Sequence, residues 1–272
     1  MRKRVIGGLC LLAALGVAGV AQAATDNTQT MSVTVSPSKV PKSKYANVQL
    51  KNVTTTGSTA TGAFAITPVV KAQIFYDKDI KFDTQGVKQC NASLEGTTTA
   101  VALQKCGNAK IGAGQAKVKI GGNPALPDTI GKITAFNSKP KGGKPVILLH
   151  VRVDAIASTQ ILTATLNKTN GKYGWRLDVK VPPLPAGTAV TVFQVNINHK
   201  PVVTKKTKTI RRNGRTVRKT IRTTHYYVAA KCSHANRKWS YKGTFFYRSD
   251  PLDPTPNSGS LSATAQQSCQ VR

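Results

Sequence analysis

The chemistry that the sequence offers most plainly is anion binding, in the stretch KKTKTIRRNGRTVRKTIRTT at residues 205–224. Its twenty residues include nine lysines and arginines and no aspartate or glutamate. Lysine binds phosphate and carboxylate as a point charge, and arginine binds them as a two-pronged donor. We therefore predict a polyanion-binding site made of Lys205, Lys206, Lys208, Arg211, Arg212, Arg215, Arg218, Lys219 and Arg222.

The same stretch predicts the element that carries these side chains. Asn213-Gly214 is the preferred centre of a type I′ turn, which joins two antiparallel strands in a hairpin. That turn places Lys205 opposite Arg222, Lys208 opposite Lys219, and Arg212 opposite Arg215. Like charges that face each other destabilise a sheet, so the pattern does not serve stability. The alternative to anion contact is a solvated hairpin whose charge keeps an edge from pairing with neighbours.

Catalytic motifs are missing from the sequence. It has no G-x-S-x-G, no H-E-x-x-H and no phosphate-binding G-x-x-x-x-G-K-[ST] loop. The four histidines lie far apart, and His150, within the apolar ILLHVRV, is interpreted as a core residue. We predict a protein that is not an enzyme and has no cofactor. The alternative is a secreted hydrolase or carbohydrate-active enzyme in which Asp77, Asp79 or Asp154 meets a histidine or a second carboxylate.

Metal binding is weighed at two places and predicted at neither. Asp77, Asp79 and Asp83 in DKDIKFD could hold calcium, but Lys81 and Phe82 break the EF-hand spacing. The interleaved lysines favour a surface strand with local ion pairs. Zinc is the rival for the cysteines, yet the sequence has no C-x-x-C and a single nearby histidine, in Cys232-Ser233-His234.

Aromatic residues near the C-terminus allow a further surface. Trp239, Tyr241, Phe245 and Tyr247 lie in KWSYKGTFFYR, and Trp175 lies further upstream. Such rings could form a platform on which sugars stack. Aromatic positions in strands are more often packed in the core, which is the interpretation we prefer.

The N-terminus predicts export. Arg2, Lys3 and Arg4 precede an apolar run, and Ala21-Gln22-Ala23 offers small residues for cleavage before Ala24. Residues 1–23 are thus predicted to be a signal peptide, with an uncleaved anchor as the alternative. Removing three cations from the chain's net charge of +30 leaves 30 − 3 = +27.

A charge of this size concerns partners and solubility, not fold. For an exported protein it favours an anionic cell-wall polymer, an acidic polysaccharide or an anionic lipid surface. Nucleic acid is expected to bind only non-specifically, through release of counterions. No later apolar run is long enough to span a membrane, so the expected location is the cell envelope or the outside of the cell.

Four cysteines remain after the leader: Cys90, Cys106, Cys232 and Cys269. An even number in an exported chain predicts two disulfides, and four cysteines allow three pairings. The local pairing, Cys90 with Cys106 and Cys232 with Cys269, is the one we favour.

The elements that must position these groups are mostly strands. Apolar and polar residues alternate with period two at 31–37, 48–53, 115–120, 159–167, 174–181 and 189–198, and 144–153 is apolar enough to be buried on both faces. One short helix is expected at 97–106. We predict an all-β fold, an elaborated antiparallel β-sandwich of immunoglobulin-like or jelly-roll-like form, with the long basic hairpin. Residues 24–272 are expected to form a single domain.

Several phrases of the sequence, in this order, resemble a group of secreted β-rich proteins of Actinobacteria that have no assigned activity. They are FYDKDIKFDTQGVKQC (75–90), KCGNAKIGAGQA (105–116), TAFNSKPKGGKPVILLHVRV (134–153) and YGWRLDVKVPPL (173–184), followed by Cys232 and Cys269. The resemblance covers residues 65 to 272. It implies export and a mostly β fold, and it implies no activity.

Overall fold

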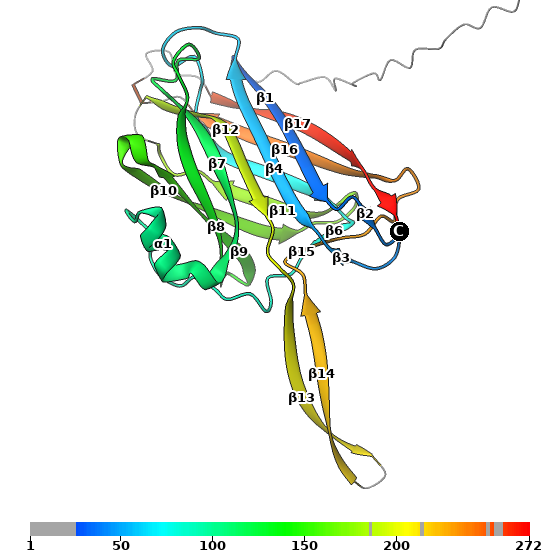
Figure 1. Ribbon diagram of the computed structural model, residues 1–272. Coiled ribbons are helices and arrows are strands. Elements are labelled where there is room, and N and C mark those ends of the chain that lie inside the picture. The colour runs from blue at the N-terminus through cyan, green and yellow to red at the C-terminus, as the bar shows by residue number, and fades with distance from the viewer. Residues whose placement is uncertain (1–25, 185–186, 213–214, 249–250, 253–257) are drawn as a thin grey trace, which may run out of the picture.

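The computed structural model describes residues 26–184, 187–212, 215–248, 251–252 and 258–272. The predicted signal peptide and the Asn213-Gly214 turn lie outside the described residues, as do the side chains of Arg212 and Arg215. The elements are β1 Asn27–Ser36, β2 Lys39–Val40, β3 Ala46–Asn47, β4 Gln49–Ser58, β5 Val69–Asp77, β6 Ile80–Phe82, α1 Thr99–Cys106, the short 3-10 helix η1 Gly107–Ala109, β7 Lys110–Ile120, β8 Thr129–Lys141, β9 Lys144–Val153, the 3-10 helix η2 Asp154–Ile156, β10 Ser158–Lys168, β11 Tyr173–Lys180, β12 Thr188–Ile197, β13 Val202–Arg212, β14 Arg215–His225, β15 Val228–Ala230, β16 Lys238–Arg248, β17 Ser258–Ser268 and β18 Gln270–Val271 (Figure 1).

One large antiparallel sheet dominates the molecule. Its eleven strands run in the order β1-β4-β12-β7-β8-β9-β10-β11-β5-β16-β17, and the sheet curls until its first and last strands approach each other. The side chain of Gln267 on β17 joins them, because its Oε1 accepts from Val35 N at 2.6 Å and its Nε2 donates to Val35 O at 2.9 Å. Next to this contact β18 pairs with β2 in parallel. The sheet is therefore nearly closed into a barrel.

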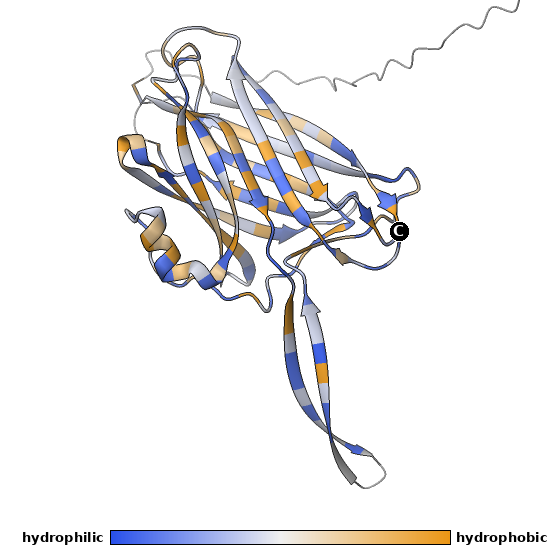
Figure 2. Cartoon of the chain, in the orientation of Figure 1, coloured by the Kyte–Doolittle hydropathy of each residue, from blue (hydrophilic) through white to orange (hydrophobic). Residues whose placement is uncertain are grey.

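The alternating sequence pattern explains which side of each strand faces inward. On β1 the buried residues Met31, Val33 and Val35 alternate with exposed ones, and Figure 2 shows the same alternation of apolar and polar positions on its neighbours. β9 is buried on both faces, as its apolar run predicts. Ile147, Leu149 and Val151 belong to the main core, which lies inside the curled sheet.

The second face of β8 and β9 is covered from outside by the predicted helix. Helix α1 starts after Thr98, whose side chain accepts a hydrogen bond from Val101 N. Cys106 at its end forms a disulfide with Cys90, and this segment encloses a small second core with Leu94, Ala102 and Phe136. Cys232 pairs with Cys269, so the structure has the favoured pairing.

The predicted hairpin is the feature that leaves the body of the molecule. Strands β13 and β14 pair only with each other in the sheet topology and project from one end of the curled sheet (Figure 1). Hydrophilic residues predominate along it in Figure 2.

The structure confirms an all-β protein with one short helix and a long basic hairpin. It does not confirm two separate packed sheets, because eleven strands belong to one continuous sheet. Among the described residues, no helix has both the length and the apolar character needed to cross a membrane.

Candidate functional site

The basic hairpin forms with the predicted register. Lys205 lies opposite Arg222, Lys208 opposite Lys219 and Arg212 opposite Arg215. Each such like-charge pair is unfavourable by up to about 1 kcal/mol, less in salt. The register therefore gathers cationic charge instead of compensating it.

The cations of the hairpin are open to solvent. All predicted contact residues whose side chains are described are exposed: Lys205, Lys206, Lys208, Arg211, Arg218, Lys219 and Arg222. The ion pairs found among the described residues all lie elsewhere in the molecule. These seven side chains therefore have no carboxylate partner among the described residues.

The length and the two faces of the hairpin define the shape of the cationic surface. Each strand has 11 residues, which corresponds to about 34 Å at roughly 3.4 Å per residue. Paired residues share a face, so Lys205, Arg211, Arg218 and Arg222 lie on one face with threonines between them. Lys206, Lys208 and Lys219 lie on the other. We call the first set the threonine-side face.

The base of the hairpin is fastened to the body by a chain of polar contacts. His225 Nδ1 lies 3.0 Å from Asp83 Oδ2, and its Nε2 lies 3.0 Å from Thr204 Oγ1. Thr204 and His225 belong to the two strands of the hairpin, and Asp83 follows β6. The order hydroxyl, imidazole, carboxylate is also that of a catalytic triad.

Of the other predicted acidic residues, Asp154 is exposed, whereas Asp77 and Asp79 are buried, which corrects the prediction of a surface strand with local ion pairs. Asp77 and Asp79 are 1 % and 0 % exposed, at the turn between β5 and β6. Asp77 accepts from Asp79 N, Ser240 N and His234 Nε2, the last at 2.7 Å. The local sequence gives no signal of this burial, because Ser233, His234 and Ser240 lie more than 150 residues further along the chain.

Asp79 is equally well satisfied. Its carboxylate accepts from Ser233 N at 2.6 Å and from Ser233 Oγ at 2.7 Å, and Lys231 Nζ lies 3.7 Å away. Asp77, Asp79 and His234 are close enough to share a metal ion. The carboxylate oxygens of Asp77 and Asp79 already accept hydrogen bonds from backbone and side-chain donors. We therefore interpret this cluster as a structural contact, which lies beside the Cys232–Cys269 disulfide.

The structure confirms that His150 and the aromatic residues of β16 are core residues. His150 is fully buried, with its Nε2 3.0 Å from Thr97 O. Trp239, Tyr241, Phe245 and Tyr247 are at most 3 % exposed, so they cannot form an open platform for sugars. Trp175 is half-buried and packs edge-on against Phe82.

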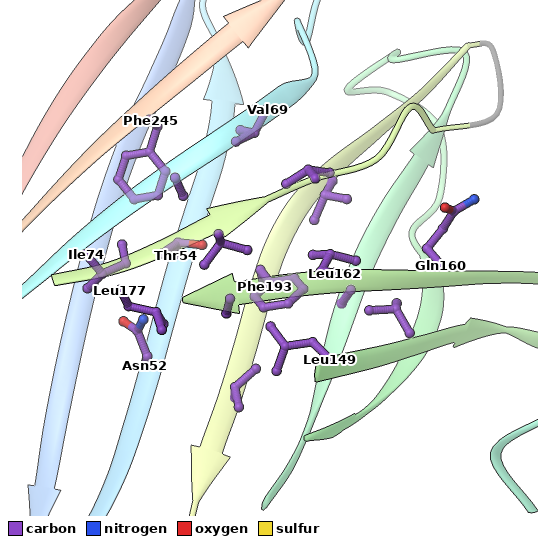
Figure 3. Close-up of a pocket in the computed structure, with 18 of the residues that line it drawn as sticks. Asn52, Thr54, Val69, Ile74, Leu149, Gln160, Leu162, Leu177, Phe193 and Phe245 are labelled. Atoms are coloured by element: carbon purple, nitrogen blue, oxygen red, sulfur yellow. The ribbon is translucent and has the colours of Figure 1, made fainter. Parts of the chain in front are cut away.

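The inside of the curled sheet contains an apolar cavity of about 140 Å³. Figure 3 shows Phe193, Leu149, Leu162 and Leu177 turned into it from different strands. The sequence pattern marks these residues as inward-facing, but it gives no signal for the space between them. That space depends on how widely the sheet curls, a property of the whole set of strands.

The chain matches no protein-family model, no curated protein and no solved structure. The resemblance to secreted actinobacterial proteins therefore stays a prediction, and function has to be argued from the chain's own residues.

Proposed function

We propose that this is an exported, non-enzymatic protein of the cell envelope or extracellular space that binds anionic polymers through its basic hairpin. The observation that carries the proposal is that the described cations of the hairpin are exposed and form no ion pair with a carboxylate of the described residues. A bound polyanion would remove the repulsion between facing like charges and release counterions.

The two-faced distribution of charge favours a linear polymer over a flat surface. A membrane meets one face of a ribbon, whereas a flexible chain can contact Lys208 and Lys219 on one face and Arg211 and Arg218 on the other. Among the predicted partners we therefore rank an anionic wall polymer or acidic polysaccharide above an anionic lipid surface. Nucleic acid should bind in vitro without sequence preference.

The test compares two charge-reversal variants that have the same net charge as each other. One variant reverses the threonine-side face, with Lys205, Arg211, Arg218 and Arg222 changed to Glu. The control reverses four exposed lysines of helix α1 and the β8–β9 hairpin, namely Lys105, Lys139, Lys141 and Lys144. Both variants lower the net charge by eight, so only the location of the charge differs.

Binding is measured with labelled heparin, glycerol-phosphate teichoic acid and vesicles of anionic lipid. The hairpin variant should bind the polymers at least about ten-fold more weakly than the control variant. Equal loss in both variants would mean that total charge, and not the hairpin, determines binding. Tighter binding to vesicles than to both polymers would reverse our order of partners.

Secretion and domain organisation belong to this proposal. The two disulfides are compatible with an oxidising compartment, and the signal peptide at 1–23 remains a prediction. So do a single domain over 24–272 and its sandwich form, immunoglobulin-like or jelly-roll-like. If mass spectrometry finds Ala24 as the first residue of the secreted chain, the predicted signal peptide at 1–23 is supported.

The alternative, a secreted hydrolase or carbohydrate-active enzyme, is favoured by two sets of contacts, and the first is the chain of contacts from Thr204 through His225 to Asp83. His234 and Asp77 form the second set, because His234 Nε2 lies within hydrogen-bond distance of Asp77 Oδ1, the histidine–carboxylate contact that this alternative requires. Neither group lines the apolar cavity. A fluorophosphonate probe that labels the protein, and fails to label Thr204→Ala, would favour the enzyme over the binding protein.

A further inference from the structure

The cavity inside the curled sheet has the organisation of a binding site. Its lining comes from β4, β5, β7, β9, β10, β11, β12 and β16 of the main sheet. The lining residues follow the period of two along these strands, as with Leu50, Asn52, Thr54 and Thr56 on β4. The cavity is therefore the common interior of the fold and not a local gap under a loop.

Several inward-facing apolar residues remain half-exposed. Leu177, Val190 and Phe193 pack against the core only in part, and so do Val69 and Ala72. Exposed apolar surface inside a fold forgoes the stabilisation that burial would give, about 25 cal/mol per Å². A molecule that filled the cavity would recover this stabilisation.

The lining also indicates the chemistry of such a molecule. No Lys, Arg, Asp, Glu or His lines the cavity among the described residues, although the chain carries 40 lysines and arginines. Tyr76 is the ionisable side chain present, and burial raises the pKa of its hydroxyl, so it stays neutral. A charged group would find no partner inside and would remain strongly disfavoured there.

One polar atom inside is unpartnered. Asn52 Oδ1 is buried and accepts no hydrogen bond from any described residue, and its side chain points into the cavity in Figure 3. A buried acceptor of this kind is stabilised by a donor that a ligand supplies.

The cavity reaches the surface beside η2. Ile156 lines it and is 42 % exposed, and Ser158 and Gln160 provide polar side chains at the start of β10. The basic hairpin projects from elsewhere on the molecule (Figure 1), so a ligand entering here would not compete with a polymer bound to the hairpin.

We propose that the cavity binds a small uncharged molecule with an alkyl or aryl body and one hydroxyl or N–H donor, the donor directed to Asn52. Its volume of about 140 Å³ is close to that of an engineered cavity of about 150 Å³ that binds benzene. The site accepts a ring or a short branched chain, and a long acyl tail is too large for it. This proposal is independent of the polyanion-binding function.

Two neighbouring threonines of β4 allow a matched test. Thr54 lines the cavity, while Thr55 is exposed on the outer face. Thr54→Phe places a ring in the cavity, and Thr55→Phe adds the same ring outside. The probe is indole, a small neutral aromatic molecule with one N–H donor, whose size fits the proposed ligand class and which is not attracted to the cationic hairpin.

We expect saturable binding of indole, measured by isothermal titration calorimetry, with the wild-type protein and with Thr55→Phe. Thr54→Phe should bind the probe about ten-fold more weakly or not at all, with an unchanged near-ultraviolet circular dichroism spectrum. If Thr54→Phe does not fold, Ala72→Leu serves as the cavity-filling variant. No saturable binding to the wild type, or equal binding to a folded cavity-filling variant, would overturn the proposal.

Competition identifies the source of the ligand. 2-Methyl-1-propanol should displace the probe from the wild-type protein, because it combines a short branched alkyl body with a hydroxyl donor. 2-Methylpropanoate, whose carboxylate is charged, should displace it poorly. Displacement by phospholipid vesicles but not by 2-methyl-1-propanol would contradict the proposed ligand class and indicate a membrane acyl chain instead.

Discussion

Asp79 joins, through its carboxylate, two segments that lie more than 150 residues apart in the chain. It is 0 % exposed, yet its carboxylate accepts two hydrogen bonds from Ser233 and lies near Lys231. A buried carboxylate is tolerated when its lone pairs are occupied in this way. Asp79 therefore holds the segment after β15 against the β5–β6 turn.

We predict that Asp79→Asn lowers the free energy of unfolding by about 1–3 kcal/mol. An amide in this position offers a donor where Ser233 already provides donors, so one contact is lost or reversed. Asp26→Asn, at an exposed carboxylate, should change stability by less than about 0.5 kcal/mol. Urea unfolding measures the free energy of unfolding of the wild type and the two variants. Equal values for all three would show that the contacts of Asp79 do not contribute to stability.

Asp128 provides a test of pH dependence. Partial desolvation raises the pKa of its carboxyl, but contacts with Lys117 and Lys119 outweigh that effect and hold the pKa below its ordinary value of 3.8. A carboxyl whose pKa is lower in the folded state stabilises the fold above the unfolded value. That contribution disappears as the pH falls through the folded value.

Asp128→Asn should therefore reduce stability at neutral pH by less than about 1 kcal/mol, as is usual for a partly exposed pair. Thermal unfolding of variant and wild type should differ above pH 3.8 and converge below it. A difference that persists undiminished in stronger acid would mean that Asp128 acts through something other than its charge.

At the scale of elements, the hairpin and the strands could be predicted because their signals are local. The sequence Asn213-Gly214 predicts the register in which Lys208 lies opposite Lys219, and the strands have that register. Helix α1 lies within the expected range. The order of strands could not be predicted, because it depends on distant partners. β5 lies between β11 and β16, for instance, and no short motif specifies that placement.

The candidate functional residues also differ in whether local sequence could predict them. The exposure of Lys205 or Arg222 follows from a charged hairpin, so sequence reasoning could find them. The cavity and the Thr204–His225–Asp83 contacts arise only when strands from distant parts of the chain meet. Their residues, such as Thr54 and Asp83, are ordinary in local context.

Removing the hairpin should leave the rest of the fold intact. Beyond its base at Thr204 and His225, β13 and β14 pair only with each other. Replacing residues 205–222 by Asn-Gly should change the melting temperature by no more than about 2 °C. A large drop would show that the hairpin is a structural part of the fold.

The two disulfides should differ in their contributions. Cys232 and Cys269 are separated by 37 positions and Cys90 and Cys106 by 16, which corresponds to about 4 and about 3 kcal/mol in the chain-entropy model. We expect Cys232→Ala/Cys269→Ala to be less stable in urea than Cys90→Ala/Cys106→Ala. The reverse order would indicate that the covering of β8 and β9 by α1 matters more than loop length.

At the scale of the whole molecule, the predicted mature chain carries about 27 more positive than negative charges, concentrated in the C-terminal third, which has no acidic residue between Asp178 and Asp250. Nine of these positive charges, a third of the excess, lie on the hairpin, which we predict the body does not need for its own stability. The combination is what a binding arm for a polyanion requires.

The salt dependence of binding to labelled linear polyphosphate tests this most directly, with the wild type, the hairpin deletion and the four-lysine control compared. With about 0.7 per contact for single strands, contact with four hairpin cations, such as Lys208 and Lys219 on one face and Arg211 and Arg218 on the other, predicts that the slope of log K against log salt becomes shallower by about 3 in the deletion. The control should keep nearly the wild-type slope. Equal slopes and affinities for the wild type and the deletion would contradict the assignment of the hairpin as the binding site.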